Sequence, residues 1–128
     1  MAEDRDAPLA GERVLVVEDE MFVAQDIAYG VQDAGGAVIG PVPTVEEAME
    51  LMEEGPTGAI LDVNLLDGDV TPVLERLVRL GVPAVVNTGT ARPWEMESEF
   101  PSVPVFTKPT DPEVLADALR QAVEARRK

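Results

Sequence analysis

The stretch Gly58-Ala59-Ile60-Leu61-Asp62-Val63-Asn64-Leu65-Leu66-Asp67-Gly68 decides both the fold and the candidate site of this chain. A short apolar run rises to one carboxylate, Asp62, and then breaks into a polar turn that contains Gly68. An apolar run of this length between turn residues is typical of a buried parallel strand. In open α/β sheets, ligands bind just beyond the carboxyl ends of such strands. Asp62 is therefore the candidate reactive residue, provided that other polar side chains arrive beside it.

Four more apolar runs of this kind, at residues 13–17, 37–40, 83–87 and 103–106, alternate with amphipathic segments. The intervening segments repeat apolar residues every three or four positions, which predicts helices that begin near Met21, Thr44, Thr71 and Asp111, with a short one over residues 95–99. Alternating strands and helices require right-handed crossovers and a parallel sheet covered on both faces. The predicted fold is a doubly wound (βα)5 domain of the flavodoxin-like type, with strand order 2-1-3-4-5.

A single domain accounts for the length of 128 residues. We expect residues 1–12 to form a flexible leader, residues 13–125 to form the domain, and residues 126–128 to form a basic end that suits the negative pole of the last helix. No output domain is expected in the remaining sequence.

The composition excludes several function classes. The 25 acidic and 10 basic residues give a net charge of −15, which opposes binding to nucleic acids and to anionic membranes and favours proteins or cations as partners. The absence of cysteine removes disulfides and thiolate chemistry, and the absence of histidine means that any phosphohistidine must belong to another protein. No signal-like segment and no apolar run of ~20 residues is present, which favours the cytosol.

The predicted strand order brings polar residues from distant parts of the chain to one sheet edge. The switch point lies between the first and third strands, whose carboxyl ends carry Glu18, Asp19 and Asp62. Thr88 after the fourth strand and Lys108 after the fifth open onto the same edge. We therefore expect three carboxylates, one hydroxyl and one ammonium group to converge in a single crevice.

This ordered set of residues resembles the receiver domain of bacterial response regulators over nearly the whole chain. The resemblance implies the following roles: Asp62 accepts the phosphoryl group, Glu18, Asp19, Asp62 and the backbone carbonyl of Asn64 hold Mg²⁺, and Thr88 and Lys108 contact the phosphoryl group. It also implies a cis bond between Lys108 and Pro109. The implied phosphodonor is a sensor histidine kinase or a histidine phosphotransfer protein, and the implied output is docking to a downstream protein or draining of phosphate from a pathway.

Some positions depart from the family pattern. Val105 stands where many receivers carry an aromatic residue that swings inward on activation, and strand alternation points the neighbouring Phe106 to the opposite face. Thr88-Gly89-Thr90 resembles the threonine-glycine loop of some stand-alone receivers, in which Gly89 loosens the loop. Val105, Gly89 and Thr90 are therefore candidate modulating residues.

Each marker also has a structural explanation when it is taken alone. Acids after a strand can favour the dipole of the next helix, Asp62 can be a turn former, Thr88 a strand former and Lys108 a solvated loop residue. Asp67 and Asp69 are assigned to turn chemistry. Two other functions remain open: a pseudo-receiver that docks without phosphorylation, and a phosphohydrolase of the haloacid dehalogenase kind. The hydrolase usually carries its nucleophile on the first strand, so the chain order favours the receiver.

Overall fold

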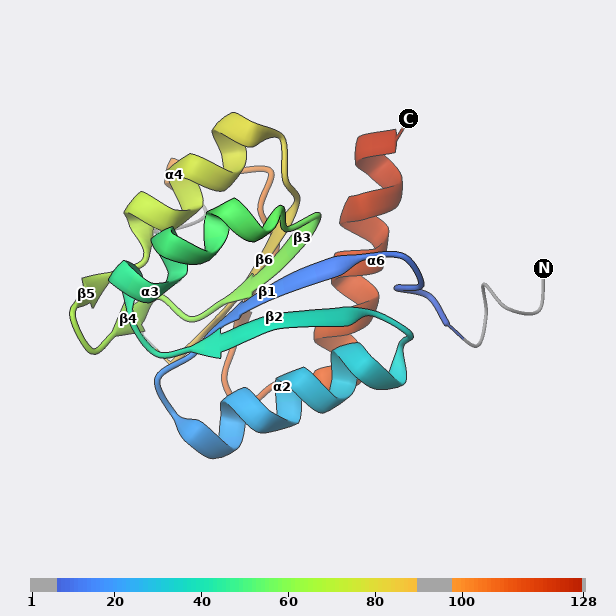
Figure 1. The fold of residues 1–128 in the computed structure, drawn as a ribbon, viewed down its shortest axis with the longest axis horizontal. Helices are drawn as coiled ribbons and strands as arrows, with labels where there is room; N and C mark the ends of the chain where they lie inside the picture. The colour runs from blue at the N-terminus through green and yellow to red at the C-terminus, as the bar shows by residue number, and fades with distance from the viewer. Residues whose placement is uncertain (1–6, 90–97, 128) are drawn as a thin grey trace.

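The described part of the chain folds into three layers, with helices on both faces of a parallel sheet (Figure 1). The computed structural model describes residues 7–89 and 98–127. The strands of the central sheet are β1 (Arg13–Val17), β2 (Ala37–Val42), β3 (Gly58–Leu61), β6 (Ala84–Thr88) and β7 (Val105–Thr107). The helices with described bounds are α2 (Met21–Asp33), α3 (Val45–Glu50), α4 (Thr71–Leu80) and α6 (Pro112–Arg127), with the 3-10 turn η1 (Leu51–Glu54) after α3.

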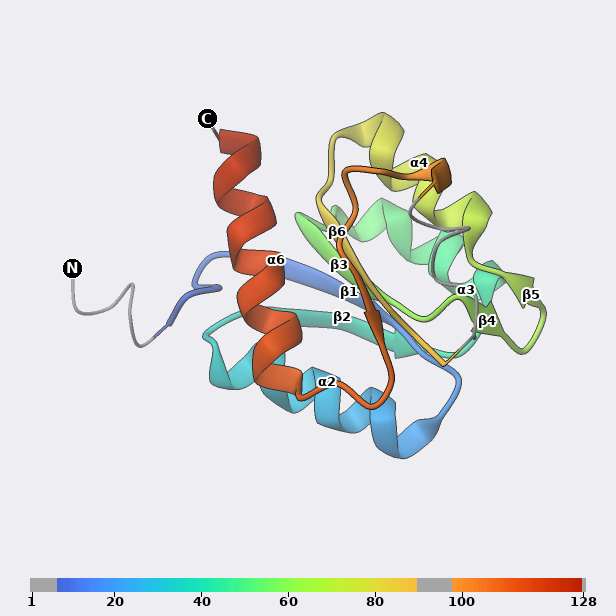
Figure 2. The ribbon, with the colours of Figure 1, turned by 180° about the vertical axis from the view of Figure 1, so that it is seen from behind.

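The sheet has the predicted topology. Its strands lie in the order β2-β1-β3-β6-β7, and every neighbouring pair is parallel. Seen from both sides, α2 and α6 cover one face of the sheet while α3 and α4 cover the other (Figures 1 and 2). The flavodoxin-like class and the order 2-1-3-4-5 are therefore confirmed. The switch point of the strand order falls between β1 and β3, and Asp62 follows directly after β3.

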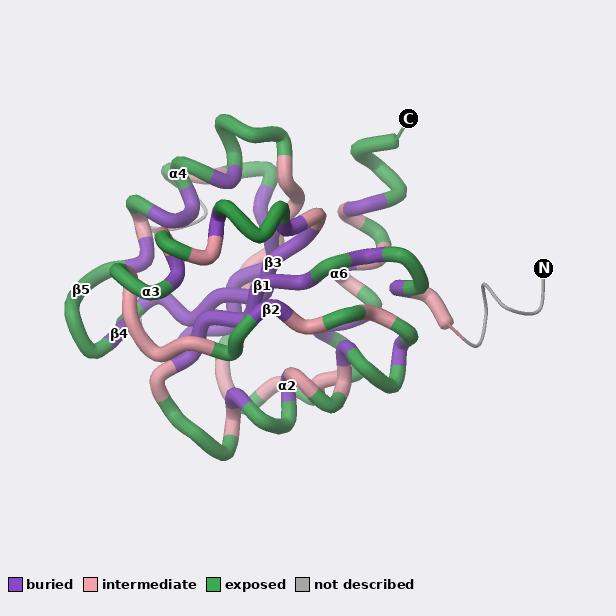
Figure 3. The backbone as a smooth tube through the Cα atoms, in the orientation of Figure 1, coloured by how far each residue is buried: buried purple, intermediate pink, exposed green. Residues whose placement is uncertain are grey.

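Strand alternation divides the core into two halves. In β1, Leu15 and Val17 pack with residues of α3 and α4, whereas Val14 and Val16 pack with residues of α2 and α6. Figure 3 shows the buried positions gathered along the central strands and on the inward sides of the helices. Because both faces are covered, the central strands need apolar residues at consecutive positions. This requirement explains why the apolar runs in the sequence were such clear strand signals.

The helices α3 and α4 begin close to the predicted starts, and side chains or a glycine cap their ends. Thr44 caps α3, since its Oγ1 accepts a hydrogen bond from the Glu47 amide at 3.1 Å. Gly81 ends α4 in the left-handed region, with φ of 71°. The helix α4 begins at Thr71 itself, at the predicted start. Asp69 takes the capping role, because its carboxylate accepts hydrogen bonds from the Thr71 amide at 2.7 Å and from the Thr71 hydroxyl.

A short hairpin follows the candidate reactive residue. Strands β4 (Asn64–Leu65) and β5 (Gly68–Asp69) pair in an antiparallel manner where only a loop was expected. At its tip, the Asp67 carboxylate accepts hydrogen bonds from the amides of Val45 at 2.7 Å and Glu46 at 3.1 Å. The assignment of Asp67 to turn chemistry was thus incomplete, because this residue also ties the loop after Asp62 to the start of α3. These hydrogen bonds lower the pKa of Asp67.

The folded domain begins earlier than residue 13. Leu9 is fully buried against the core half beneath α2 and α6, and its amide donates to the Ala34 carbonyl at 2.7 Å. Glu12 is buried and pairs with Arg127 at 2.6 Å, a contact in addition to the expected effect of residues 126–128 on the helix dipole. The expected flexible leader is therefore wrong for residues 7–12, because an apolar side chain and an ion pair hold this segment to the domain. Residues 1–6 lie outside the described residues.

Other predictions fall partly or wholly outside the described residues. Thr90 and most of the expected helix over residues 95–99 belong to this group. The bonds Gly40-Pro41 and Lys108-Pro109 are both cis, the second as the resemblance implies. Within the described ranges, no helix combines the length and the apolar character that crossing a bilayer requires.

Candidate functional site

The candidate site lies at the carboxyl edge of the sheet, where three residues follow directly after strands. Each of the three keeps one backbone hydrogen bond to a neighbouring strand segment: Glu18 N–H to Val42 O at 2.9 Å, Asp62 N–H to Val17 O at 2.8 Å, and Lys108 N–H to Thr88 O at 2.8 Å. The ladder thus continues one residue past the strands. This arrangement fixes the positions from which the three side chains leave the sheet.

Three carboxylates meet at this edge, as the strand order predicted. Glu18, Asp19 and Asp62 each offer an oxygen, and these oxygens all lie within 4.8 Å of one another. Glu18 is only 3% exposed and Asp62 only 5% exposed. Two carboxylates without bulk water around them repel each other strongly, so a cation is needed nearby.

Lys108 supplies such a cation. Its Nζ lies 2.9 Å from Glu18 Oε1, 3.1 Å from Asp62 Oδ2 and 3.2 Å from Glu20 Oε2. The strand order predicted Lys108 near Glu18 and Asp62, but nothing in the sequence assigned Glu20 to the site. The only available signal was its place directly after the acidic pair, which an ordinary helix-start acid would share.

One ammonium group does not fully compensate two buried carboxylates. Burial raises the pKa of Glu18 to about 7, even though hydrogen bonds from Lys108 and from the Glu20 amide act in the opposite direction. The pKa of Asp62 is also raised, again chiefly by burial. Burial alone would lower the pKa of Lys108, but its hydrogen bonds to Glu18 and Asp62 outweigh that effect and raise it. The negative charge of the buried carboxylates is therefore only partly compensated by Lys108.

The three carboxylates could hold a divalent cation. Glu18 Oε1 is buried and accepts no hydrogen bond from any described residue, although it lies near the Lys108 ammonium. A buried oxygen with free lone pairs, beside two further carboxylates, fits the preference of hard cations for oxygen ligands. Asn64, whose carbonyl was expected to contribute, opens β4 with an exposed side chain.

The other predicted residues border this cluster. Thr88 is fully buried at the end of β6, and Gly89 lies against Lys108, since a Cβ on Gly89 would be 3.7 Å from Lys108 Cδ. Val105 packs in the core half of α3 and α4, whereas Phe106 packs on the opposite side. Phe106 therefore faces away from the side of Val105, as strand alternation predicted.

A pH dependence of stability follows from Glu18. Its pKa rises from 4.5 to about 7 on folding, so the folded protein holds a proton that the unfolded chain releases. The free energy of unfolding of the metal-free protein should therefore fall between about pH 5 and about pH 8, by up to about 3 kcal/mol. Urea unfolding across this range checks the decline, and Glu18→Gln should flatten it. An unchanged decline in Glu18→Gln would assign it to other groups.

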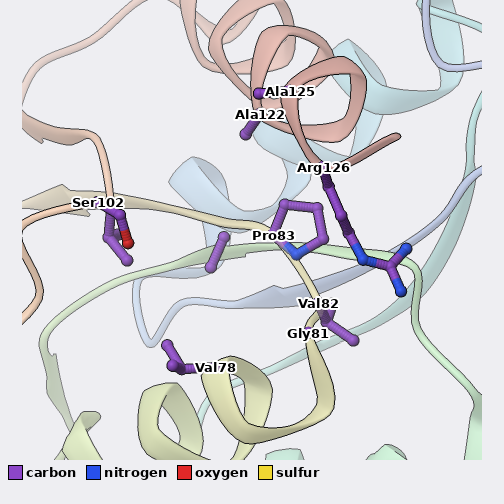
Figure 4. Close-up of a pocket in the computed structure, with 10 residues that line it drawn as sticks. Val78, Gly81, Val82, Pro83, Ser102, Ala122, Ala125 and Arg126 are labelled. Atoms are coloured by element: carbon purple, nitrogen blue, oxygen red, sulfur yellow. The ribbon is translucent and has the colours of Figure 1, made fainter. Parts of the chain in front are cut away.

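A second pocket lies at the opposite edge of the sheet. It has a volume of about 350 Å³ and opens between the end of α4, the start of β6 and the last turns of α6 (Figure 4). Val78, Val82 and Pro83 give it an apolar wall, and Arg126 is its only charged lining residue within the described part of the chain. None of the described residues that line it carries a carboxylate.

The described architecture matches the flavodoxin-like fold of CheY-like proteins. No sequence-family model matches the chain, and no curated protein matches it significantly. Solved structures do match it. The response regulator receiver domain protein (CheY-like) of Methanospirillum hungatei JF-1 superposes with a TM-score of 0.79 at 21% identity, over 91% of this chain and 96% of that one.

Two further structures are more similar in sequence. SdrG from Sphingomonas melonis Fr1 is 32% identical, with a TM-score of 0.72 over 94% of this chain and 98% of SdrG. The response regulator PhyR from Brucella abortus is 26% identical, with a TM-score of 0.78 over 97% of this chain. This chain spans about half of PhyR, at 53% of its length. The chain belongs to the receiver-domain family of response regulators.

Proposed function

We propose that this chain is a phosphorylatable receiver, in which Asp62 accepts a phosphoryl group from a phosphohistidine donor and thereby changes the binding of a downstream protein. The single observation that carries the proposal is the contact between Lys108 Nζ and Asp62 Oδ2 at 3.1 Å, inside a cluster with Glu18 and Asp19. A turn-forming aspartate would need neither the burial nor the lysine. Receiver-domain relatives are signalling proteins and not turnover enzymes, which argues against a phosphohydrolase.

The proposed transfer is a displacement at phosphorus. A carboxylate oxygen of Asp62 forms the new bond to phosphorus, and the bond from phosphorus to the donor imidazole nitrogen breaks. The electron pair of that bond stays on the nitrogen that carried phosphorus, and because the other ring nitrogen of the donor bears a proton, the donor leaves as neutral imidazole. Water later cleaves the mixed anhydride to restore Asp62 and release phosphate, so the signal is reversible.

Residues of this chain would hold and compensate the charge of the transferred group. Lys108 lies close enough to Asp62 to pair with a phosphoryl oxygen once it leaves the carboxylates. Glu18, Asp19 and Asp62 would hold Mg²⁺, with the backbone carbonyl of Asn64 as a further ligand. When bound, Mg²⁺ compensates the negative charge that spreads over the phosphoryl oxygens.

The proposed signal passes through the loop after β6. Phosphorylation adds roughly −1.5 to −2 charge at Asp62, and Thr88 could donate its hydroxyl to one of the new oxygens. Gly89, directly after Thr88, gives that loop freedom to move. Val105 offers no aromatic ring to transmit the change, which leaves the loop itself, with Thr90, as the element that a partner would read.

The test is phosphoryl uptake from a small phosphodonor. With Mg²⁺ and acetyl phosphate, intact-mass spectrometry should show one added phosphoryl group per chain, and the mass shift should be absent when EDTA is present. Failure to gain the group under conditions that phosphorylate a reference receiver would favour the pseudo-receiver. Release of many equivalents of phosphate from a phosphate monoester would favour the hydrolase instead.

A further inference from the structure

The pocket shown in Figure 4 shares none of its described lining residues with the acidic cluster. It lies beside Pro83 and Ala84, where β6 begins, whereas Thr88 ends the same strand near that cluster. Its volume of about 350 Å³ lies within the range of pockets that hold small molecules. A ligand bound here would therefore be separate from the metal ion and from the phosphoryl group.

Small side chains leave the space in this pocket open. Ala122 and Ala125, one turn apart on α6, lie across the pocket from Val78 of α4 (Figure 4). Val78 is 51% exposed and Ala125 is also exposed, so this apolar surface faces solvent. Apolar surface lined up on two sides of a cavity favours a ligand with an apolar part, because binding removes both surfaces from water.

Arg126 supplies the charge of the pocket. Its guanidinium makes no ion pair and no hydrogen bond with any described residue. The acids that its helix neighbours use are already engaged, since Arg127 pairs with Glu12 at 2.6 Å and Arg120 pairs with Glu124 at 3.0 Å. An arginine beside apolar walls, with no carboxylate among the described lining residues, favours an anionic group on the ligand.

Capping of α4 does not account for the position of Arg126. The guanidinium does lie near the end of that helix, because a Cβ on Gly81 would be 3.7 Å from Arg126 Nε. The end of α4 is nevertheless capped by its own backbone: the Gly81 amide donates to the Val78 carbonyl at 3.0 Å, and the Val82 amide donates to the Leu77 carbonyl at 2.9 Å. The N–H donors of Arg126 are not used in this cap.

We propose that this pocket binds a small amphipathic carboxylate, of which octanoate is an example. The planar fork of the Arg126 guanidinium would donate two hydrogen bonds to the carboxylate. The hydrocarbon chain would lie between Val78 and the two alanines of α6, where its burial stabilises the complex. The net charge of −15 disfavours anions in general, so the site selects those whose apolar part offsets that repulsion.

The test is a titration of the ¹⁵N-labelled full chain with octanoate, followed by amide NMR. Acetate, which lacks the chain, and octylammonium, which reverses the charge, are the comparison ligands. We expect saturable shifts at Val78, Val82 and Ala125, with a Kd for octanoate of about 1 mM, which is ordinary for a ligand of this size. At these residues acetate and octylammonium should bind at least about tenfold more weakly. Absence of saturable shifts with octanoate, or equal affinity for octylammonium, would overturn the proposal.

Two variants with matched controls assign the binding to the pocket. Arg126→Gln should weaken octanoate binding by about tenfold, whereas Arg76→Gln, which removes an exposed cation outside the pocket, should leave it unchanged. Ala125→Leu should weaken binding at least about tenfold because the larger side chain fills the space, whereas Gln121→Leu, at an exposed position that does not line the pocket, should not.

All four substitutions are at exposed positions, so the variants should fold like the wild type, as thermal unfolding checks. Unchanged octanoate binding in Arg126→Gln, or equal weakening by a variant and its control, would overturn the proposal. Phosphoryl uptake is not measured in any of these experiments, so their outcome is independent of the proposed function.

Discussion

Asp62→Asn is expected to abolish phosphoryl uptake completely while making the metal-free domain more stable at neutral pH. The asparagine amide cannot act as the nucleophile, so intact mass should stay unchanged with acetyl phosphate and Mg²⁺. The gain in stability has a separate cause. Asp62 is 5% exposed and its pKa is raised, which means that its ionised form is unfavourable in the fold. Removal of that charge relieves repulsion with Glu18.

Two measurements on the same variant test both parts of this expectation. Mass spectrometry reports phosphoryl uptake, and thermal unfolding with and without Mg²⁺ reports stability. Asp33→Asn is the matched control, because it removes an exposed carboxylate from the same chain and should be phosphorylated like the wild type. Phosphoryl uptake by Asp62→Asn would move the acceptor to another carboxylate. A drop in its metal-free stability would contradict the view that burial of this charge is costly.

The fold was predictable from the sequence because its main determinants are local. A parallel sheet with both faces covered needs consecutive apolar residues, and the run 58–61 shows that need directly. Once five such runs alternate with amphipathic helices, handedness and crossover rules leave few strand orders. The convergence of Glu18, Asp62 and Lys108 then follows from the order alone, without any knowledge of side-chain conformations.

Other features depend on contacts that no local pattern encodes. Leu9 lies in a polar segment with Pro8 and Gly11, and only the structure shows that it fills the core between α2 and α6. The pairing of Glu12 with Arg127 joins opposite ends of the chain. The sequence alone indicates that Asp67 is a turn residue. Its hydrogen bond to the Val45 amide at the start of α3 depends on the position of the β4–β5 hairpin relative to that helix. Each of these is a long-range contact made by a side chain with an ordinary local explanation.

The sequence predicted which residues form the site, but it did not predict how their charges balance. From the sequence, Lys108 was expected beside the acids, but Glu20 was not expected as a third partner. Nor was it expected that the buried Oδ1 of Asn87 would accept no hydrogen bond from any described residue. Both depend on the direction and reach of side chains, which strand order does not fix. The balance between the carboxylates and Lys108 determines the stability of the site without metal, and removal of Lys108 should therefore have a large effect.

Lys108→Met is expected to change metal binding and phosphoryl transfer in opposite directions. In the wild type, the ammonium occupies the space among Glu18, Glu20 and Asp62 and competes with a divalent cation for their charge. Without it, Mg²⁺ should bind more tightly, as measured by calorimetry. Uptake from acetyl phosphate should nevertheless slow by about 100-fold, since one preorganised donor to the phosphoryl group is lost.

Stability gives the same substitution a third, independent readout. At about pH 8, where Glu18 is ionised, the metal-free variant leaves buried carboxylates without their cation and should lose about 3 kcal/mol of unfolding free energy. Saturating Mg²⁺ should restore most of this loss, because the metal replaces the missing charge. Arg120→Met, which removes an exposed cation paired with Asp117 and Glu124, should show neither the loss nor the rescue. If Lys108→Met instead bound Mg²⁺ more weakly, the lysine would have to organise the carboxylates for the metal and not compete with it.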